Sequence, residues 1–222
     1  MAAQRLDVIT PFHVMALLAR ARQLEAEGRS IVHMEIGEPD FVSPDSIIEA
    51  GIKALQDGRT HYTPSLGLPE LRTAIAEHYQ TRFGVHVDPG RIIVTPGASG
   101  ALQLIVAALV DPGKEMLLTD PGYPCNRNFV YLYNGVPVTV PVDAADDYQL
   151  NAGLVERYWT NNTVAAMLAS PSNPTGTVLH RDGLAALLDA VRKRSGTLIV
   201  DEIYQNLCYQ YQPWTALELG DD

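Results

Sequence analysis

The sequence predicts an α/β fold: a three-layer α/β/α arrangement in which helices cover both faces of a mainly parallel sheet. Two observations support this prediction. From residue 91 onward, short and continuously apolar stretches alternate with stretches of helical periodicity. The composition, with 46% hydrophobic and 19% charged residues in 222, is that of a globular protein with a sizeable core.

Each expected strand is an apolar run, and each expected helix repeats apolar residues at helical spacing. The strands are RIIVT (91–95), EMLLT (115–119), VPVTVPV (136–142), VAAMLAS (164–170) and TLIVD (197–201). Helices are expected over 98–110, 123–133 and 180–194. This alternation of strand and helix favours a parallel sheet.

Before residue 91 the sequence predicts helices and loops. The helices are expected near 11–28 and over 43–55 and 68–83. For the second of them we expect Ser43 as the cap and Pro44 in the first turn. In the third we expect Leu68, Leu71 and Ile75 to face inward.

The charge and the cysteines exclude several classes of protein. A formal net charge of −10 argues against a nucleic-acid surface or a polybasic membrane contact. No apolar run approaches the roughly 20 residues of a membrane span, and the amphipathic N-terminus does not resemble a signal peptide. Cys125 and Cys208 lie far apart, which indicates a reducing cytoplasm. The six histidines lack metal-ligand spacing, so we expect no metal site.

Functional residues follow the carboxyl ends of the expected strands, where open α/β sheets bind their ligands. The segments at these ends are PGASG (96–100), DPGYP (120–124), PSNPTG (171–176) and DEIY (201–204). If the strands are parallel, the groups in these segments meet at one rim of the sheet.

Each group has a functional and a structural interpretation. The loop with Ser99 opens a helix, so it is either a phosphate seat or a plain glycine-rich turn. Tyr123 stacks on a flat ring or packs in its turn. Asn173 offers a fixed amide to a ligand or caps its own backbone. Asp201 pairs with a cation, binds a metal or caps a loop.

An aliphatic strand that ends in Asp-Glu also resembles the magnesium-binding strand of nucleotide triphosphatases. That interpretation requires a GxxxxGK[ST] loop, whose lysine reaches the phosphates. The three lysines of the sequence, Lys53, Lys114 and Lys193, all lie outside such a loop. The triphosphatase hypothesis is therefore rejected.

Together these segments resemble the class I/II aminotransferases, the fold-type I enzymes that use pyridoxal 5′-phosphate. The matching stretches are IGEPDF (36–41), HYTPSLGLPELR (61–72), TPGASGAL (95–102), DPGYP (120–124), SPSNPTG (170–176) and VDEIY (200–204). They occur in the order of the family and span nearly the whole chain. SPSNPTG followed by VDEIY about thirty residues later is the most specific part.

The resemblance implies roles at the cofactor ring. Asp201 would pair with the protonated pyridine nitrogen, and that cation would keep the carboxylate ionised despite burial. Tyr204 and Asn173 would hydrogen-bond the phenolic oxygen of the ring, and Tyr123 would stack on its face.

It also implies roles at the phosphate and beyond. Backbone N–H groups of Ala98 and Ser99, with the Ser99 hydroxyl, would hold the phosphate. Tyr62 would reach the phosphate of the neighbouring subunit, which implies a homodimer. Gly37 would lie against the α-carboxylate of the substrate.

The sequence departs from the family at its C-terminal end. The Schiff-base lysine of the family lies shortly beyond the VDEIY strand, so we expect it C-terminal to Asp222 and no catalytic residue in this chain. The arginine that grips the substrate carboxylate is expected there too. We interpret residues 1–45 as an N-terminal arm and part of a small domain, and 46–222 as an incomplete large domain. A truncated chain, inactive alone, is expected; a deliberate fragment and a non-catalytic paralogue are the alternatives.

The resemblance implies amino-group transfer from an amino acid to a 2-oxo acid in a cytoplasmic homodimer, with no nucleic-acid or membrane partner. One alternative is another fold-type I reaction, such as that of a C–S lyase or a cyclopropane-forming synthase. The other is a non-catalytic effector domain that binds the cofactor. The choice of amino acid depends on parts that these motifs do not cover.

Overall fold

A computed structural model describes residues 2–210 and 212–220 and divides the chain into two compact units. One unit contains Pro69–Asp222 together with Met1–Thr10, and the other contains Pro11–Leu68. The predicted parallel sheet lies in the first unit.

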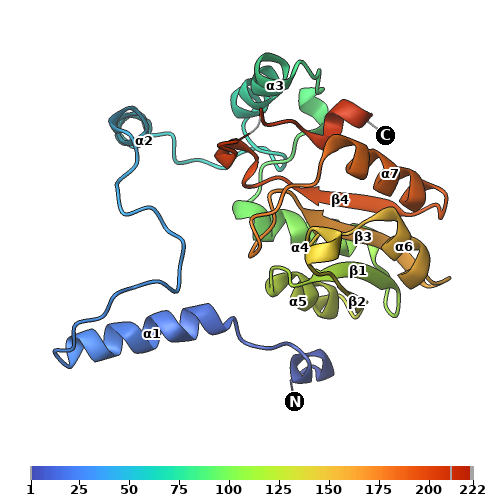
Figure 1. Ribbon diagram of the computed structural model, residues 1–222. Coiled ribbons are helices and arrows are strands. Elements are labelled where there is room, and N and C mark those ends of the chain that lie inside the picture. Colours follow the sequence, from blue (N-terminus) through green and yellow to red (C-terminus); the bar gives the residue numbers. More distant parts are fainter. Residues whose placement is uncertain (1, 211, 221–222) are drawn as a thin grey trace. The chain divides into compact units, whose positions relative to one another are not determined.

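The sheet has four strands, all parallel, in the order β2-β1-β3-β4 (Figure 1). Its strands are β1 (Glu115–Asp120), β2 (Val136–Pro141), β3 (Thr163–Ala169) and β4 (Thr197–Asp201). In the register, Leu118 of β1 pairs with Thr139 of β2 and with Met167 of β3. Because the strands are parallel, their carboxyl ends reach one rim of the sheet, as the sequence predicted.

Helices cover both faces of this sheet (Figure 1). They are α4 (Gly97–Leu109) and α5 (Cys125–Leu132) on one face, and α6 (Ala152–Tyr158) and α7 (Arg181–Arg192) on the other. Adjacent residues of β1 serve opposite faces, since Leu117 packs in the cluster of α6 and α7 and Leu118 in that of α4 and α5. The predicted three-layer α/β fold is confirmed.

The packing of α7 against the sheet shows how the sequence specifies the core. Leu184, Leu187 and Val191 repeat at helical spacing and are all buried. Full burial of one such side chain contributes about 1.5–3 kcal/mol. At the edge of this face a Cβ on Gly196 would overlap the Trp159 ring, so only glycine fits there.

The remaining elements of the described residues are helical. The unit Pro11–Leu68 contains α1 (His13–Ala26) and α2 (Asp45–Gln56), and α3 (Pro69–Phe83) belongs to the larger unit. Five 3₁₀ turns in the described residues are η1 (Gln4–Asp7), η2 (Pro89–Arg91), η3 (Ala144–Asp146), η4 (Gln205–Leu207) and η5 (Ala216–Leu219).

The strand predicted over 91–95 is wrong. The chain forms η2 up to Arg91 and is then irregular, and Ile93 is 56% exposed. Apolar composition gives a strand only where a neighbouring backbone can pair with it. Within the described residues, the sheet consists of four other segments, and 92–95 pairs with none of them.

Two predictions for the N-terminal helices are also wrong. Pro44, and not Ser43, is the N-cap residue of α2, and no side chain in the described part of the chain caps it. Leu68 and Leu71 are 43% and 44% exposed, whereas Ile75 is half-buried. Helical periodicity identified an apolar face of α3, but the described residues cover only part of it.

Candidate cofactor-binding site

A cavity of about 220 Å³ opens at the carboxyl ends of the parallel strands. Nine residues line it: Ala98, Ser99, Leu102, Tyr123, Ala169, Asn173, Asp201, Ile203 and Tyr204. Six of them are residues that the sequence singled out for cofactor binding, from four separate segments. The structure brings these six together: four of them lie at or just beyond the carboxyl ends of the parallel strands, and Ala98 and Ser99 lie in the first turn of α4.

The N-terminus of α4 forms one wall of the cavity. Gly97 begins the helix with φ = 73°, a conformation that favours glycine, and buried Leu102 anchors the helix to the core. The first-turn N–H groups of an α-helix lack intrahelical acceptors. In the described structure, no side chain caps this end, because its N-cap residue is Pro96. These N–H groups and the exposed Ser99 hydroxyl therefore form a seat suited to a phosphate.

Asp201 is the last residue of β4 and lines the cavity with a partly buried carboxylate. Its Oδ1 accepts a hydrogen bond of 3.0 Å from the backbone N–H of Ile203. This bond fixes the carboxylate at the mouth of the strand. A fixed carboxylate can pair with a protonated ring nitrogen and hold the proton there.

Tyr123 contributes an aromatic ring from the loop after β1. A hydrogen bond with Cys125, assisted by burial, raises the pKa of the Tyr123 hydroxyl to about 12. The charges of Cys125, Tyr204 and Asp201 act in the same direction. The phenol therefore stays neutral at physiological pH, and its ring face can stack on a flat ligand.

Asn173 lies in a loop that the structure holds firmly. The N–H of Ser172 donates to the Thr177 carbonyl at 2.9 Å, and Gly176 donates back to Ser172 at 2.8 Å. The buried Gln149 donates from Nε2 to the carbonyls of Ala169 (3.2 Å) and Thr177 (3.1 Å). The Asn173 amide is thus presented by a braced turn.

Sequence reasoning missed Gln149, because nothing local marks it. It lies in an irregular stretch before α6, and its partners are 20 and 28 residues away along the chain. Reasoning from the sequence also missed the three apolar residues that complete the lining of the cavity, Leu102, Ala169 and Ile203. Leu102 could have been found, since it begins the apolar face of the predicted helix that opens at the phosphate seat.

Two predicted site residues, Gly37 and Tyr62, belong to the unit Pro11–Leu68. Both are exposed within it, and the Tyr62 side chain is fully so. Their roles stay predictions.

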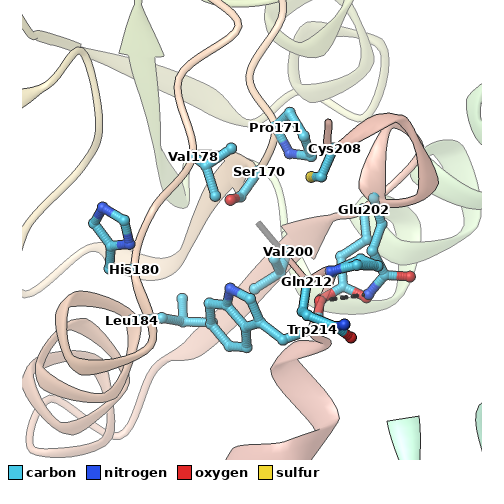
Figure 2. Close-up of a pocket in the computed structure, with 12 residues that line it drawn as sticks. Ser170, Pro171, Val178, His180, Leu184, Val200, Glu202, Cys208, Gln212 and Trp214 are labelled. Carbon is cyan, nitrogen blue, oxygen red and sulfur yellow. Dashed lines mark hydrogen bonds between the residues drawn. The ribbon is translucent and has the colours of Figure 1, made fainter. Parts of the chain in front are cut away.

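Three further features bear on what the chain can bind. Within residues 2–210 and 212–220, no three His, Cys, Asp or Glu side chains gather closely enough to hold a metal ion. In the same residues, no helix has the length and apolar character of a transmembrane segment. A second hollow of about 90 Å³ lies beside Val178, Leu184 and Trp214 (Figure 2). Its lining is mostly apolar.

The donor set of the 220 Å³ cavity fits a phosphorylated pyridine ring. The seat at α4 suits the phosphate, Asp201 suits the ring nitrogen and Tyr123 suits the ring face. Asn173 and Tyr204 offer an amide and a phenol for a ring oxygen. Among the described residues no Lys or Arg lines this cavity, and the groups it offers to the phosphate are the helix N–H groups and the Ser99 hydroxyl.

Comparisons with known proteins agree with this fit. The family model described as aminotransferase class I and II matches residues 29–221. A (5-formylfuran-3-yl)methyl phosphate transaminase of Methanocaldococcus jannaschii is 36% identical over all of this chain and 57% of its own length. A probable aspartate/prephenate aminotransferase of Aquifex aeolicus is 37% identical over 93% of this chain and 52% of its own.

A solved structure gives the same result. The aspartate aminotransferase from Thermus thermophilus with maleate superimposes with a TM-score of 0.93 at 33% identity. The match covers 99% of this chain and 57% of that one. This chain spans about half the length of the curated relatives it matches.

Proposed function

This chain belongs to the class I and II aminotransferases, a family that depends on pyridoxal 5′-phosphate, and on that premise we propose that it forms the cofactor seat of an enzyme that moves an amino group from an amino acid to a 2-oxo acid. The observation that supports the proposal most strongly is the 220 Å³ cavity, in which six predicted residues from four segments converge. A family match alone would leave the site unspecified.

The residues of the cavity divide the work of holding the cofactor. The N–H groups of Ala98 and Ser99 hold the phosphate, and Tyr123 covers one face of the ring. Asn173 and Tyr204 hydrogen-bond the phenolic oxygen of the ring. When bound, pyridoxal phosphate supplies an electron sink for the carbanion of the amino acid.

Asp201 determines how well that sink works. Its carboxylate, fixed by the Ile203 N–H, accepts a hydrogen bond from the ring nitrogen and keeps the proton on it. Loss of this carboxylate would leave the phosphate seat intact and weaken the chemistry.

Other parts of the proposal lie outside the cavity. The lysine that bonds covalently to the cofactor is proposed to lie C-terminal to Asp222, in keeping with relatives about twice as long as this chain. Gly37 is proposed to contact the substrate carboxylate, and Tyr62 to contact the phosphate of a second subunit in a homodimer. Residues 1–45 are proposed as the arm and part of a small domain, and 46–222 as the large domain. The cytoplasm is the proposed compartment.

Amino-group transfer is preferred over the other reactions of this scaffold. The relatives described above are named transaminases and aminotransferases, and none is named a lyase or a cyclopropane-forming synthase.

Product analysis tests the proposal directly. The full-length protein is loaded with pyridoxal phosphate and incubated with single amino acids and a 2-oxo acid. We expect one new amino acid and one new oxo acid in equal amounts. Pyruvate with ammonia, and no new amino acid, would show β-elimination instead. Borohydride reduction followed by intact mass measurement should add one cofactor per chain.

A further inference from the structure

We propose that Glu202 is a positioning residue, whose carboxylate ties residues 214–216 to the end of β4 and so holds Asp201 and Tyr204 toward the cofactor cavity. The inference rests on the proposed function, because it concerns the same cavity. The resemblance to the family assigns no role to Glu202.

Three hydrogen-bond donors converge on the Glu202 carboxylate. Its Oε2 accepts from Gln205 Nε2 at 3.0 Å and from Thr215 Oγ1 at 2.9 Å. Its Oε1 accepts from the backbone N–H of Ala216 at 2.6 Å. Two of the donors lie 13 and 14 residues further along the chain. The carboxylate therefore joins two segments that the sequence separates.

The second segment is itself fixed to the core. Thr215 is fully buried, and it forms a reciprocal capping box with Glu218 at the start of η5. Trp214, Ala216 and Leu219 pack against the hydrophobic cluster below α7. A group tied to this segment is consequently held in place relative to the sheet.

The first segment carries the cofactor ligands. Glu202 follows Asp201 directly and precedes Tyr204 by two residues, and the Gln205 N–H donates to the Glu202 carbonyl at 2.9 Å. Gln205 is 7% exposed, and its Nε2 also donates to the Trp214 carbonyl at 2.7 Å. Residues 201–205 thus form one turn, anchored from the side of Glu202.

The two carboxylates face different spaces. Asp201 lines the 220 Å³ cavity, whereas Glu202 lines the 90 Å³ hollow, with Val178 and His180 across that hollow from it (Figure 2). Successive side chains at a strand end point to opposite sides. A rotation of the backbone at 201–202 would therefore displace both groups at once, and the network on the Glu202 side opposes that rotation.

The three hydrogen-bond donors indicate the protonation state of Glu202 in this network. Burial raises the pKa of Glu202, and hydrogen bonds from Ala216 and Thr215 oppose that shift. All three neighbours offer hydrogens, so the ionised carboxylate satisfies them and a glutamine, with one acceptor oxygen, does not. Glu202→Gln keeps the shape of the side chain and removes only part of the network.

The test compares Glu202→Gln with the wild type in the full-length protein. Dissociation constants are measured for pyridoxal phosphate and, by competition, for inorganic phosphate, and the absorption spectrum of the bound cofactor is recorded. We expect at least a tenfold weaker affinity for pyridoxal phosphate and a shifted spectrum. The affinity for inorganic phosphate should change less than twofold, because the seat at α4 does not depend on Glu202.

Glu218→Gln is the matched control. Glu218 anchors the same segment through the capping box and through Arg181 at 3.1 Å, without bonding to Glu202. It should lower the melting temperature and change the affinity for pyridoxal phosphate and the spectrum much less than Glu202→Gln does. If Glu202→Gln does not fold, Thr215→Val is the replacement test, because it removes one of the three donors. Thr215→Ser keeps the hydroxyl and should restore the wild-type affinity.

The outcomes separate the two proposals. Wild-type affinity and spectrum in Glu202→Gln would overturn the positioning role alone. An equal loss of affinity in Glu218→Gln, at an equal loss of melting temperature, would also overturn it. Failure of the wild type to bind pyridoxal phosphate would overturn the proposed function and this inference with it.

Discussion

At the scale of single residues, Asp201 shows how one hydrogen bond prepares a side chain for chemistry. The Ile203 N–H binds one carboxylate oxygen at 3.0 Å, so the side chain is oriented before any ligand arrives. Pre-orientation matters because a catalytic group that must first find its geometry contributes less to the rate. Asp201 should therefore be costly to lose.

We predict that Asp201→Ala in the full-length protein lowers kcat/KM by at least about 10³-fold, or ~4 kcal/mol. The reason is the loss of the proton on the ring nitrogen, while the phosphate seat remains. Steady-state kinetics on the loaded enzyme measure the effect. Asp189→Ala, which removes an exposed acid from α7, is the control and should leave kcat/KM unchanged. Activity of Asp201→Ala within a few-fold of the wild type would contradict the assigned role.

Tyr123 gives a prediction on pH. Its pKa is raised to about 12 from 10.0, so the protonated phenol is favoured in the folded state. The resulting stability is complete below pH 10 and is lost as the pH rises toward 12. Ultraviolet titration at 295 nm should show a late tyrosine that is missing in Tyr123→Phe and is distinct from Tyr79, whose pKa burial also raises. Cys125→Ala should return that titration toward pH 10, because the hydrogen bond with Cys125 is the main cause; an unchanged midpoint would argue against the bond.

The residues of the site differed in how well they could be predicted from the sequence. Ala98, Ser99, Tyr123, Asn173, Asp201 and Tyr204 could be predicted because each lies in a short segment after a strand or at the start of a helix. The residues that hold these site residues in place could not be predicted. Gln149 and Glu202 act through partners that are distant in the sequence, and local pattern contains no record of such contacts.

At the scale of elements, periodicity identified the four strands of the sheet and three of the four helices that cover it, but it failed over 91–95 and at α6. The four strands succeed because each finds a neighbour in the sheet. Residues 92–95 have the same apolar composition without a paired backbone in the described chain. Composition reports burial, whereas a strand also requires hydrogen-bond partners. The short helix α6 was missed because its seven residues make only about two turns, too few for an apolar periodicity to be recognised.

Gly196 tests the packing between α7 and β4. A Cβ at this position would overlap the Trp159 ring, and overpacking of a core costs about 1–3 kcal/mol. We predict that Gly196→Ala lowers the free energy of unfolding by that amount, measured by urea denaturation. Gly153→Ala is the control: its Cβ would lie 3.4 Å from Asn151 Oδ1 in the first turn of α6. It should be neutral or slightly stabilising; equal losses would show that the Trp159 contact is not the cause.

At the scale of the whole molecule, the chain contains a cavity that fits the cofactor of its family. It spans about half of its relatives, and the cavity is lined from a single unit of the chain. The sequence predicted the fold class and the family because the motifs of the sheet rim are all present. Substrate choice could not be predicted, since the groups that contact the substrate are not among these motifs.

Tyr62 carries the prediction about assembly. Its side chain is fully exposed within its unit, where a tyrosine that serves only its own chain gains little from its ring. If Tyr62 binds the phosphate of a second subunit, a hybrid dimer of Tyr62→Phe with Asp201→Ala contains one intact site and one doubly defective site. We predict that such hybrids recover about half of the activity of the wild-type dimer, whereas neither parent homodimer reaches that level. Activity no higher than the mean of the two parents would mean that Tyr62 serves its own subunit or lies outside the site.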